Sequence, residues 1–128
     1  MTNLPETTKN LALQEAQRLL YDVAGLTAVV VATVDGFDVA SAVRGDIESS
    51  RIAAMASSIS AISEVVSQEA RLGRGKSVTI DTESGFAVVH AVDHPELPLV
   101  ISVIADETAM LGQVLIRSSR LAHLLAGA

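Results

Sequence analysis

A chain of 128 residues with 15 acidic and 9 basic side chains has a formal net charge of −6, and the phosphates of nucleic acids repel a surface of this sign. Cysteine is absent, which excludes disulfides, thiolate zinc sites and a cysteine nucleophile. Hydrophobic residues make up 49% of the sequence, yet no apolar run reaches the roughly 18 residues that a membrane-spanning helix needs. We therefore expect residues 1–128 to form one domain, ordered from about residue 7 to residue 125, that binds no nucleic acid and inserts into no membrane.

The start of the chain carries no pattern of a secretory signal. Glu6, Lys9 and Asn10 interrupt any apolar segment there. We expect a cytoplasmic protein whose excess apolar surface is buried in the fold or against a partner.

The first third of the chain is predicted to form a helix and a hairpin. Apolar residues recur at helical spacing from Thr7 to Ala24, and Gly25 suits the end of that helix. The valine-rich run Leu26–Val34 predicts a strand covered on both faces. Asp35-Gly36 then favours a tight turn, after which Phe37–Val43 returns antiparallel.

The rest of the chain is predicted to contain a long helix, three strands and a last helix. The long helix begins at Glu48 or Ser49, runs to about Leu72 and is ended by Gly73 and Gly75. The strands are expected at Lys76–Thr82, Phe86–Val92 and Leu99–Ala105. Asp106 is expected to be the N-cap of a helix over residues 107–125. The order is α-β-β-α-β-β-β-α, which indicates an α+β fold with a five-stranded, mostly antiparallel sheet and helices on both faces.

The long helix has an apolar stripe at heptad spacing. The stripe consists of Ile52, Met55, Ile59, Ile62 and Val66. No charged residue occurs between Ile52 and Ser63, where the other positions are alanine or serine. Because a helix with one face in water normally carries charges there, we interpret this helix as packing on its own sheet and on a second subunit. The alternative is a surface helix that happens to be rich in serine and alanine.

No motif of catalysis or metal binding is complete. Gly73–Ser77 resembles the end of a phosphate-binding loop, but Ala70 stands where the first glycine is required and a strand follows instead of a helix. His90 and His94 have no third metal ligand nearby and are interpreted as surface or loop histidines, and His123 as a cation that favours the helix dipole. The carboxylates Asp35, Asp38 and Asp46 lack the remaining ligands of a calcium loop. We therefore expect no enzyme activity, no catalytic residue, no metal and no cofactor.

The order and spacing of several short segments resemble the Roadblock family, the dynein light-chain Roadblock type that also includes bacterial MglB-like proteins. The resemblance covers nearly the whole chain. Its segments are Val23–Leu26, Ala28–Ala32, Asp35-Gly36 with Val39–Ser41, Ile52–Met55 and Leu72–Gly75. It implies a profilin-like fold and a dimer formed by the long helices and by the edge strand that follows them. The interface residues would be Ile52, Met55, Ala56, Ile59, Ser60, Ile62, Ser63, Val66, Val78 and Ile80.

The resemblance also implies a function. Roadblock proteins are partners of small Ras-like GTPases, as scaffolds, exchange factors or activators, and MglB-like dimers activate a bacterial GTPase without donating a catalytic arginine. We therefore expect a homodimeric regulator or scaffold of a small Ras-like GTPase. Candidate docking residues near the ends of the long helix are Arg44, Arg51, Arg71 and Arg74. Three alternatives stay open: a structural subunit of a larger complex that is indifferent to nucleotide, a small-molecule sensor, and a dimer with a different paralogue.

Overall fold

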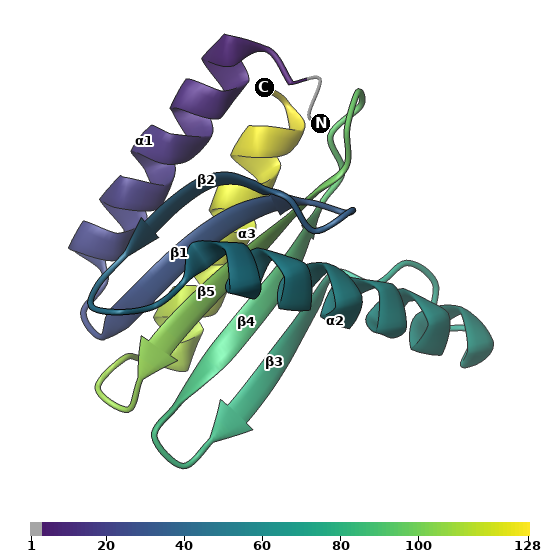
Figure 1. Ribbon diagram of the computed structural model, residues 1–128. Helices are drawn as coiled ribbons and strands as arrows, with labels where there is room; N and C mark the ends of the chain where they lie inside the picture. Colours follow the sequence, from purple (N-terminus) through teal and green to yellow (C-terminus); the bar gives the residue numbers. More distant parts are fainter. Residues whose placement is uncertain (1–3) are drawn as a thin grey trace.

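The computed structural model describes residues 4–128, which form one sheet and three helices (Figure 1). The elements are α1 (Glu6–Asp22), β1 (Leu26–Thr33), β2 (Asp38–Val43), α2 (Ser49–Glu69), β3 (Ser77–Thr82), β4 (Gly85–Val92), β5 (Leu99–Asp106) and α3 (Leu111–Ala126). The predicted α+β class and element order are confirmed.

The five strands form a single antiparallel sheet in the order β2-β1-β5-β4-β3. The strands β1 and β5 lie at its centre, and both are buried along almost their whole length. Helices α1 and α3 cover one face of the sheet and α2 crosses the other (Figure 1). The continuous apolar runs of β1 and β5 are therefore explained, because each of these strands has helices on both sides.

Alternate residues of the strands supply two separate cores. On the α1 and α3 side, Val29 and Val31 of β1 join Ile101 and Val103 of β5 in the larger cluster. On the α2 side, the buried residues of β1 are Ala28, Val30 and Ala32, which pack with Ala53 of α2. Small residues on both surfaces let α2 lie close to the sheet.

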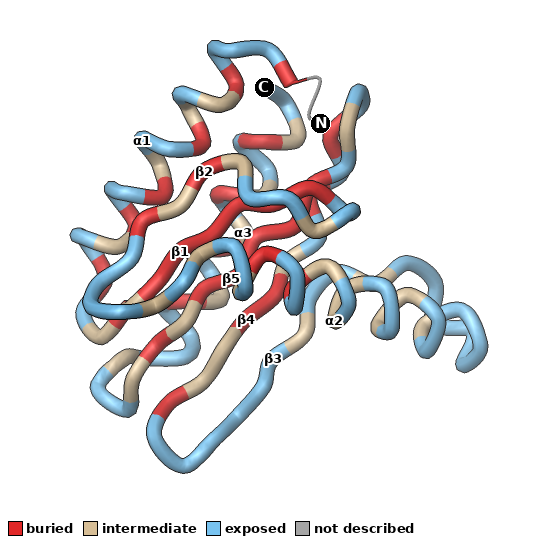
Figure 2. The backbone as a smooth tube through the Cα atoms, in the orientation of Figure 1, coloured by how far each residue is buried: buried red, intermediate tan, exposed pale blue. Residues whose placement is uncertain are grey.

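The second half of α2 extends beyond the sheet. Figure 1 shows the helix crossing β1, β5 and β4 and then continuing past β3, and Figure 2 shows that its distal turns are exposed. The buried residues of this helix, Ala53 and Ala56, both lie in its first half. A large part of α2 is therefore not covered by the fold that it belongs to.

The long helix ends earlier than the glycines predicted. It stops at Glu69, and Arg71 adopts a left-handed conformation with φ 56°. The Arg71 N–H donates to the carbonyl of Gln68 and the Leu72 N–H donates to the carbonyl of Ser67, which is the Schellman arrangement of a helix C-terminus. The left-handed position is occupied by arginine, although glycine is the usual residue there.

Arg71→Gly is expected to stabilise the protein by about 1 kcal/mol, because glycine has no Cβ to strain in the left-handed conformation. Urea unfolding at fixed protein concentration measures the change. Arg51→Gly, in the first turns of the same helix, is the control and is expected to destabilise by about 1 kcal/mol because glycine is a poor helix residue. Equal losses of unfolding free energy in both variants would contradict the left-handed conformation of Arg71.

The last helix begins later than predicted, and Asp106 is not its N-cap. Asp106 is the last residue of β5 and pairs with Gly85 of β4. Its Oδ1 accepts hydrogen bonds from the N–H and the Oγ1 of Thr108, at 2.8 and 2.6 Å. The carboxylate therefore stabilises a turn between strand and helix, and α3 starts at Leu111.

The hairpin between β1 and β2 also differs from the prediction. Phe37 lies in the turn and is exposed, and β2 begins at Asp38. A bulge between Val31 and Ala32 shifts the register, so that Asp38 pairs with Ala32 and Ala40 pairs with Val31. Phe37 therefore does not share a strand face with Val39.

Candidate functional site

Helix α2 and the edge strand β3 present a set of exposed apolar side chains. Those on α2 are exposed by 53 to 65%: Met55, Ile62, Val65 and Val66. Ile80 of β3 is also exposed, by 38%, and points to the side of the sheet that α2 covers. We call these five residues the α2–β3 face. Four of them are among the predicted interface residues, and Val65 is the one that the heptad pattern did not include.

The other predicted interface residues pack wholly or partly against the chain's own sheet. Ala56 is buried in a cluster with Val89 and Val100, so its side chain faces the chain's own sheet. Ile59 and Val78 pack on this same cluster and are half-buried, as is Ile52 beside Ala53. Ser60 and Ser63 are half-buried as well. The residues that face the sheet start with Ala53 and Ala56, each of which follows a residue of the predicted stripe by one position. One position corresponds to a rotation of about 100° about the helix axis.

Serines of α2 bind to the helix's own carbonyl groups. The hydroxyls of Ser57 and Ser58 donate to the carbonyl of Ala54, and the hydroxyl of Ser67 donates to the carbonyl of Ser63. These hydrogen bonds satisfy the hydroxyls without water, so a partner can cover this surface at little cost in desolvation.

The four candidate docking arginines do not form one patch of free charge. Arg44 donates to the carbonyl of Leu20, and Arg51 pairs with Glu48 at 3.1 Å. Arg74 is engaged by Asp93 through two hydrogen bonds of 2.8 and 3.0 Å. Within residues 4–128, Arg71 is the only one of the four whose side chain makes no hydrogen bond or ion pair.

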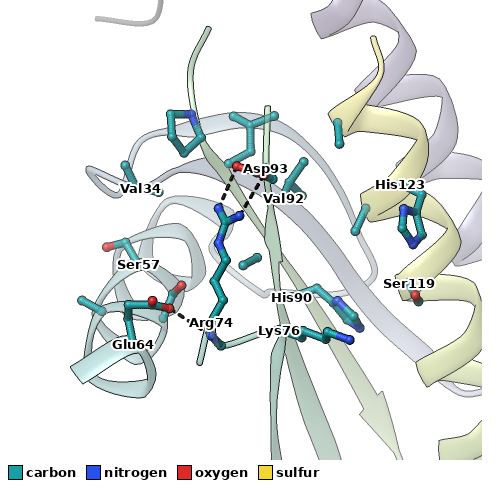
Figure 3. A pocket seen from close by; sticks show the side chains of 18 residues that line it. Val34, Ser57, Glu64, Arg74, Lys76, His90, Val92, Asp93, Ser119 and His123 are labelled. Atoms are coloured by element: carbon teal, nitrogen blue, oxygen red, sulfur yellow. Dashed lines mark hydrogen bonds and ion pairs between the residues drawn. The ribbon is translucent and has the colours of Figure 1, made fainter. Parts of the chain in front are cut away.

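A cavity of about 630 Å³ opens beside the last residues of β4. These residues follow His90, which pairs with the first residue of β3, and so have no partner in β3. The walls of the cavity come from α2, from the loop between α2 and β3, from the end of β4 and from α3. Figure 3 shows Arg74 reaching to Asp93 in one part of the cavity, with His90, Ser119 and His123 on the side of α3. The sequence could not predict this cavity, because its walls lie far apart in the chain.

The loop between α2 and β3 is held by two contacts across the cavity. Besides the Arg74–Asp93 pair, the Gly75 N–H donates to Oε2 of Glu64 on α2 at 3.2 Å. The hydrogen bonds and positive charge of Arg74 lower the pKa of the Asp93 carboxyl from its ordinary value.

Arg74→Gln is expected to raise the pKa of the Asp93 carboxyl toward its ordinary value, because both the hydrogen bonds and the charge are lost. The folded-state pKa is the lowered one, so the pair stabilises wild type above the unfolded pKa and this contribution disappears as pH falls through the folded pKa. The effect on stability is small because both side chains are exposed. Carboxyl-detected NMR titration measures the shift, and Arg51→Gln, which removes a charge that pairs with Glu48, is expected to leave Asp93 unchanged.

The histidines of β4 and of the loop after it are more buried than surface side chains. His94 lies in the loop between β4 and β5, as one of the predicted alternatives, and is buried: its Nδ1 accepts from the N–H groups of Glu96 and Leu97, and its Nε2 therefore donates to the carbonyl of Ala128. His90 is half-buried in the cavity, where burial and the nearby charge of His123 lower its pKa. Within the described part of the chain, no group of three His, Asp or Glu side chains could hold a metal ion.

A family model described as "Mitogen-activated protein kinase kinase 1 interacting" matches residues 12–127. The chain belongs to this family. The match includes every strand of the sheet, the α2–β3 face and the cavity. A search of curated proteins finds no significant match.

Solved structures similar to this family member have the Roadblock fold. MglB of Myxococcus xanthus is 18% identical, with a TM-score of 0.83 over 99% of this chain and 92% of that chain. An MglB with a tetrameric arrangement is 18% identical, with a TM-score of 0.83 over 96% and 90% of the two chains. The Roadblock/LC7 domain from Streptomyces avermitilis is 16% identical, with a TM-score of 0.79 over 88% and 92%. The Roadblock resemblance is confirmed, and at these identities the likeness establishes the fold.

None of the helices in residues 4–128 combines the length and apolar composition that crossing a membrane requires. No sequence motif predicted the cavity or the grouping of basic residues around it. Lys76, His90 and His123 belong to three different elements, and only the fold brings them to one cavity. Their spacing in the sequence carries no signal of this kind.

Proposed function

We propose that this chain is a non-catalytic, cytoplasmic regulator or scaffold of a small Ras-like GTPase that acts as a homodimer. The observation that carries the proposal is the exposed apolar α2–β3 face on a Roadblock fold. The description of the family as kinase-kinase interacting supports a role in binding other proteins. In this non-catalytic role, any effect on a GTPase would come from positioning the GTPase's own residues.

The proposed dimer joins the α2–β3 faces of two copies. Strand β3 pairs only with β4, so its other edge is free within the described residues to pair with a second chain. The exposed residues of α2 lie beside this edge strand (Figure 1). A two-fold axis would place α2 against α2 and β3 against β3, which makes each contact self-complementary. The MglB with a tetrameric arrangement is a similar fold that assembles with copies of itself.

Partner docking is assigned to the arginines at the ends of α2. Arg71 is the strongest of the four, because Arg44, Arg51 and Arg74 already have partners in residues 4–128. Arg71 and the neighbouring Leu72 are both exposed at the far end of α2, beyond the sheet. A positive and apolar surface of this kind suits an acidic partner with an apolar patch.

A pull-down in two nucleotide states tests the proposal. Tagged protein is incubated with native lysate in the presence of GDP or of a non-hydrolysable GTP analogue, and the bound proteins are identified by mass spectrometry. A small GTPase retained in one nucleotide state supports a regulator. Its loss in Arg71→Ala, with retention in the control Arg18→Ala on the exposed side of α1, would assign the docking end.

Two outcomes count against the proposal. The same partners in both nucleotide states would favour a structural subunit of a larger complex. The absence of any GTPase among the bound proteins would contradict the proposed role in GTPase regulation. The proposed dimer would be tested separately, by sedimentation velocity.

A further inference from the structure

The cavity beside β4 has the size and wall composition of a small-molecule site. Its volume of about 630 Å³ lies within the range of roughly 300–1,000 Å³ that is usual for ligand pockets. Much of the wall is apolar or carries small side chains. Examples are Val34, Ser57 and Ala61 on the α2 side and Val92, Leu99 and Ala122 on the α3 side. The α2 and α3 parts of the wall belong to opposite faces of the sheet.

The polar groups of the cavity divide into a set that is paired within the protein and a set that has no partner among the described residues. Arg74 and Asp93 neutralise each other, and Glu64 accepts the N–H of Gly75. The side chains of Lys76, His90 and His123 make no hydrogen bond or ion pair with any residue from 4 to 128. All three are bases, and they line one cavity of a protein whose net charge is −6.

The three bases come from three elements around the same opening. His90 is in β4, Lys76 immediately precedes β3, and His123 is in the last turns of α3. The Lys76 carbonyl accepts from the Ala91 N–H, which fixes the start of β3 beside His90. Figure 3 shows Lys76, His90 and His123 on the α3 side of the cavity, with the Ser119 hydroxyl near them as a further donor.

We propose that this cavity binds a small amphipathic anion. Its carboxylate or phosphate head is held by Lys76, His90 and His123, and its apolar body lies between α2 and α3. The head would supply the negative charge that this group of bases lacks, and charge-assisted hydrogen bonds are the strongest that such a head can make. None of the five residues of the α2–β3 face lines the cavity, although the neighbouring Ser60, a predicted interface residue, does.

Binding is expected to be tighter at lower pH. Burial and the charge of His123 oppose protonation of His90 in the empty cavity, and an anion beside the ring would favour it. The other charged groups facing the cavity are Lys76, Arg74, Asp93 and Glu64. Of these, Arg74 and Asp93 form a neutral pair, so protonation of His90 beside the bound anion accounts for the tighter binding at lower pH.

Titration with probes of equal chain length tests the site. Decanoate, decyl phosphate and decanol are added to the isotope-labelled full chain, and two-dimensional NMR follows the amides and the histidine rings. Decanoate or decyl phosphate is expected to bind about tenfold tighter than decanol, and the tighter of the two anions identifies the head. Inorganic phosphate alone is expected to bind weakly, because it has no apolar body.

Matched variants separate the head from the body. Lys76→Gln and His123→Gln, at exposed positions, are expected to weaken binding of the anionic probe about tenfold and leave decanol unchanged. Arg120→Gln removes a positive charge of α3 outside this cavity and is the control. Ala61→Phe, at an exposed wall position, is expected to abolish binding of every probe while the protein remains folded by circular dichroism.

Three results would overturn the proposal. One is equal affinity for decanoate, decyl phosphate and decanol in wild type, and another is the same loss of affinity in Arg120→Gln as in His123→Gln. Failure to shift the amides of the cavity residues at millimolar probe would do so as well. These readouts use the isolated chain and are independent of any GTPase.

Discussion

Ile62→Glu is expected to convert the proposed homodimer into monomers without unfolding the chain. Ile62 is exposed by 65% on α2, so the fold of one chain does not depend on it. In the proposed dimer the new carboxylate would be buried against the partner's apolar face without a counter-charge. A penalty of about 3 kcal/mol from such a buried charge corresponds to a weakening of the dimer by about a hundredfold.

Sedimentation velocity over a concentration series measures the effect. The matched control is Ile116→Glu, the same substitution at a site of α3 that is 56% exposed and lies on the other face of the sheet. We expect the control to remain a dimer, and both variants to melt as cooperatively as wild type. Wild-type protein that is monomeric at concentrations on the order of tens of micromolar would contradict the dimer.

Ala56 and Ile59 are unsuitable for this test, although Ile59 belongs to the heptad stripe and Ala56 is next to Met55 of that stripe. Ala56 is buried against Val89 and Val100, and Ile59 packs on the same cluster. A charge at either position would damage the monomer's own core. Loss of the dimer in such a variant would therefore not distinguish an interface from a folding defect.

Gly85→Ala is expected to cause the largest loss of stability of any glycine-to-alanine change in this chain. Gly85 begins β4 with φ 154°, and a Cβ there would lie 2.0 Å from the carbonyl oxygen of Ala105 and 2.9 Å from the Cα of Asp106. Both atoms belong to the backbone of β5, which is held by β1 and β4 on its two sides and cannot move away. We expect the free energy of unfolding to fall by about 3 kcal/mol or more, with misfolding as the extreme result.

Urea unfolding at matched protein concentration checks this prediction. Gly45→Ala is the control, because Gly45 also has a positive φ, of 70°, but a Cβ there would meet nothing within 4 Å. Its loss is expected to be about 1 kcal/mol, from backbone strain alone. If the two variants lose equal stability, the close approach of β4 and β5 at Gly85 is not the cause.

The positions of the elements could be predicted where one local pattern outweighed all others. The valine-rich run of β1 and the helical spacing of α1 each identified their element within a few residues. The boundary of α3 was wrong because a good N-cap residue, Asp106, also continues a strand. Pairing with Gly85 across the sheet decided between the two, and such pairing is not visible in a local segment.

The candidate interface was predicted only in part, for a geometric reason. Two neighbouring stripes of α2 are both free of charge, one starting at Ile52 and the other at Ala53. Either could face the sheet by composition alone. The close packing of Ala53 and Ala56 under β1, β4 and β5 decided which one does, and left Ile62 and Val66 outside.

The sequence by itself determined the fold class, the order of the elements and a helix without charge between Ile52 and Ser63. These follow from periodicity and composition, which act over a few turns or one strand. The Roadblock resemblance came instead from the order and spacing of several short segments. Only the tertiary structure decided which side of α2 is exposed, that Arg74 is neutralised by Asp93, and that Lys76, His90 and His123 line one cavity. Each of these depends on contacts between segments distant in the chain, and the order of residues along a chain does not contain the distances between them.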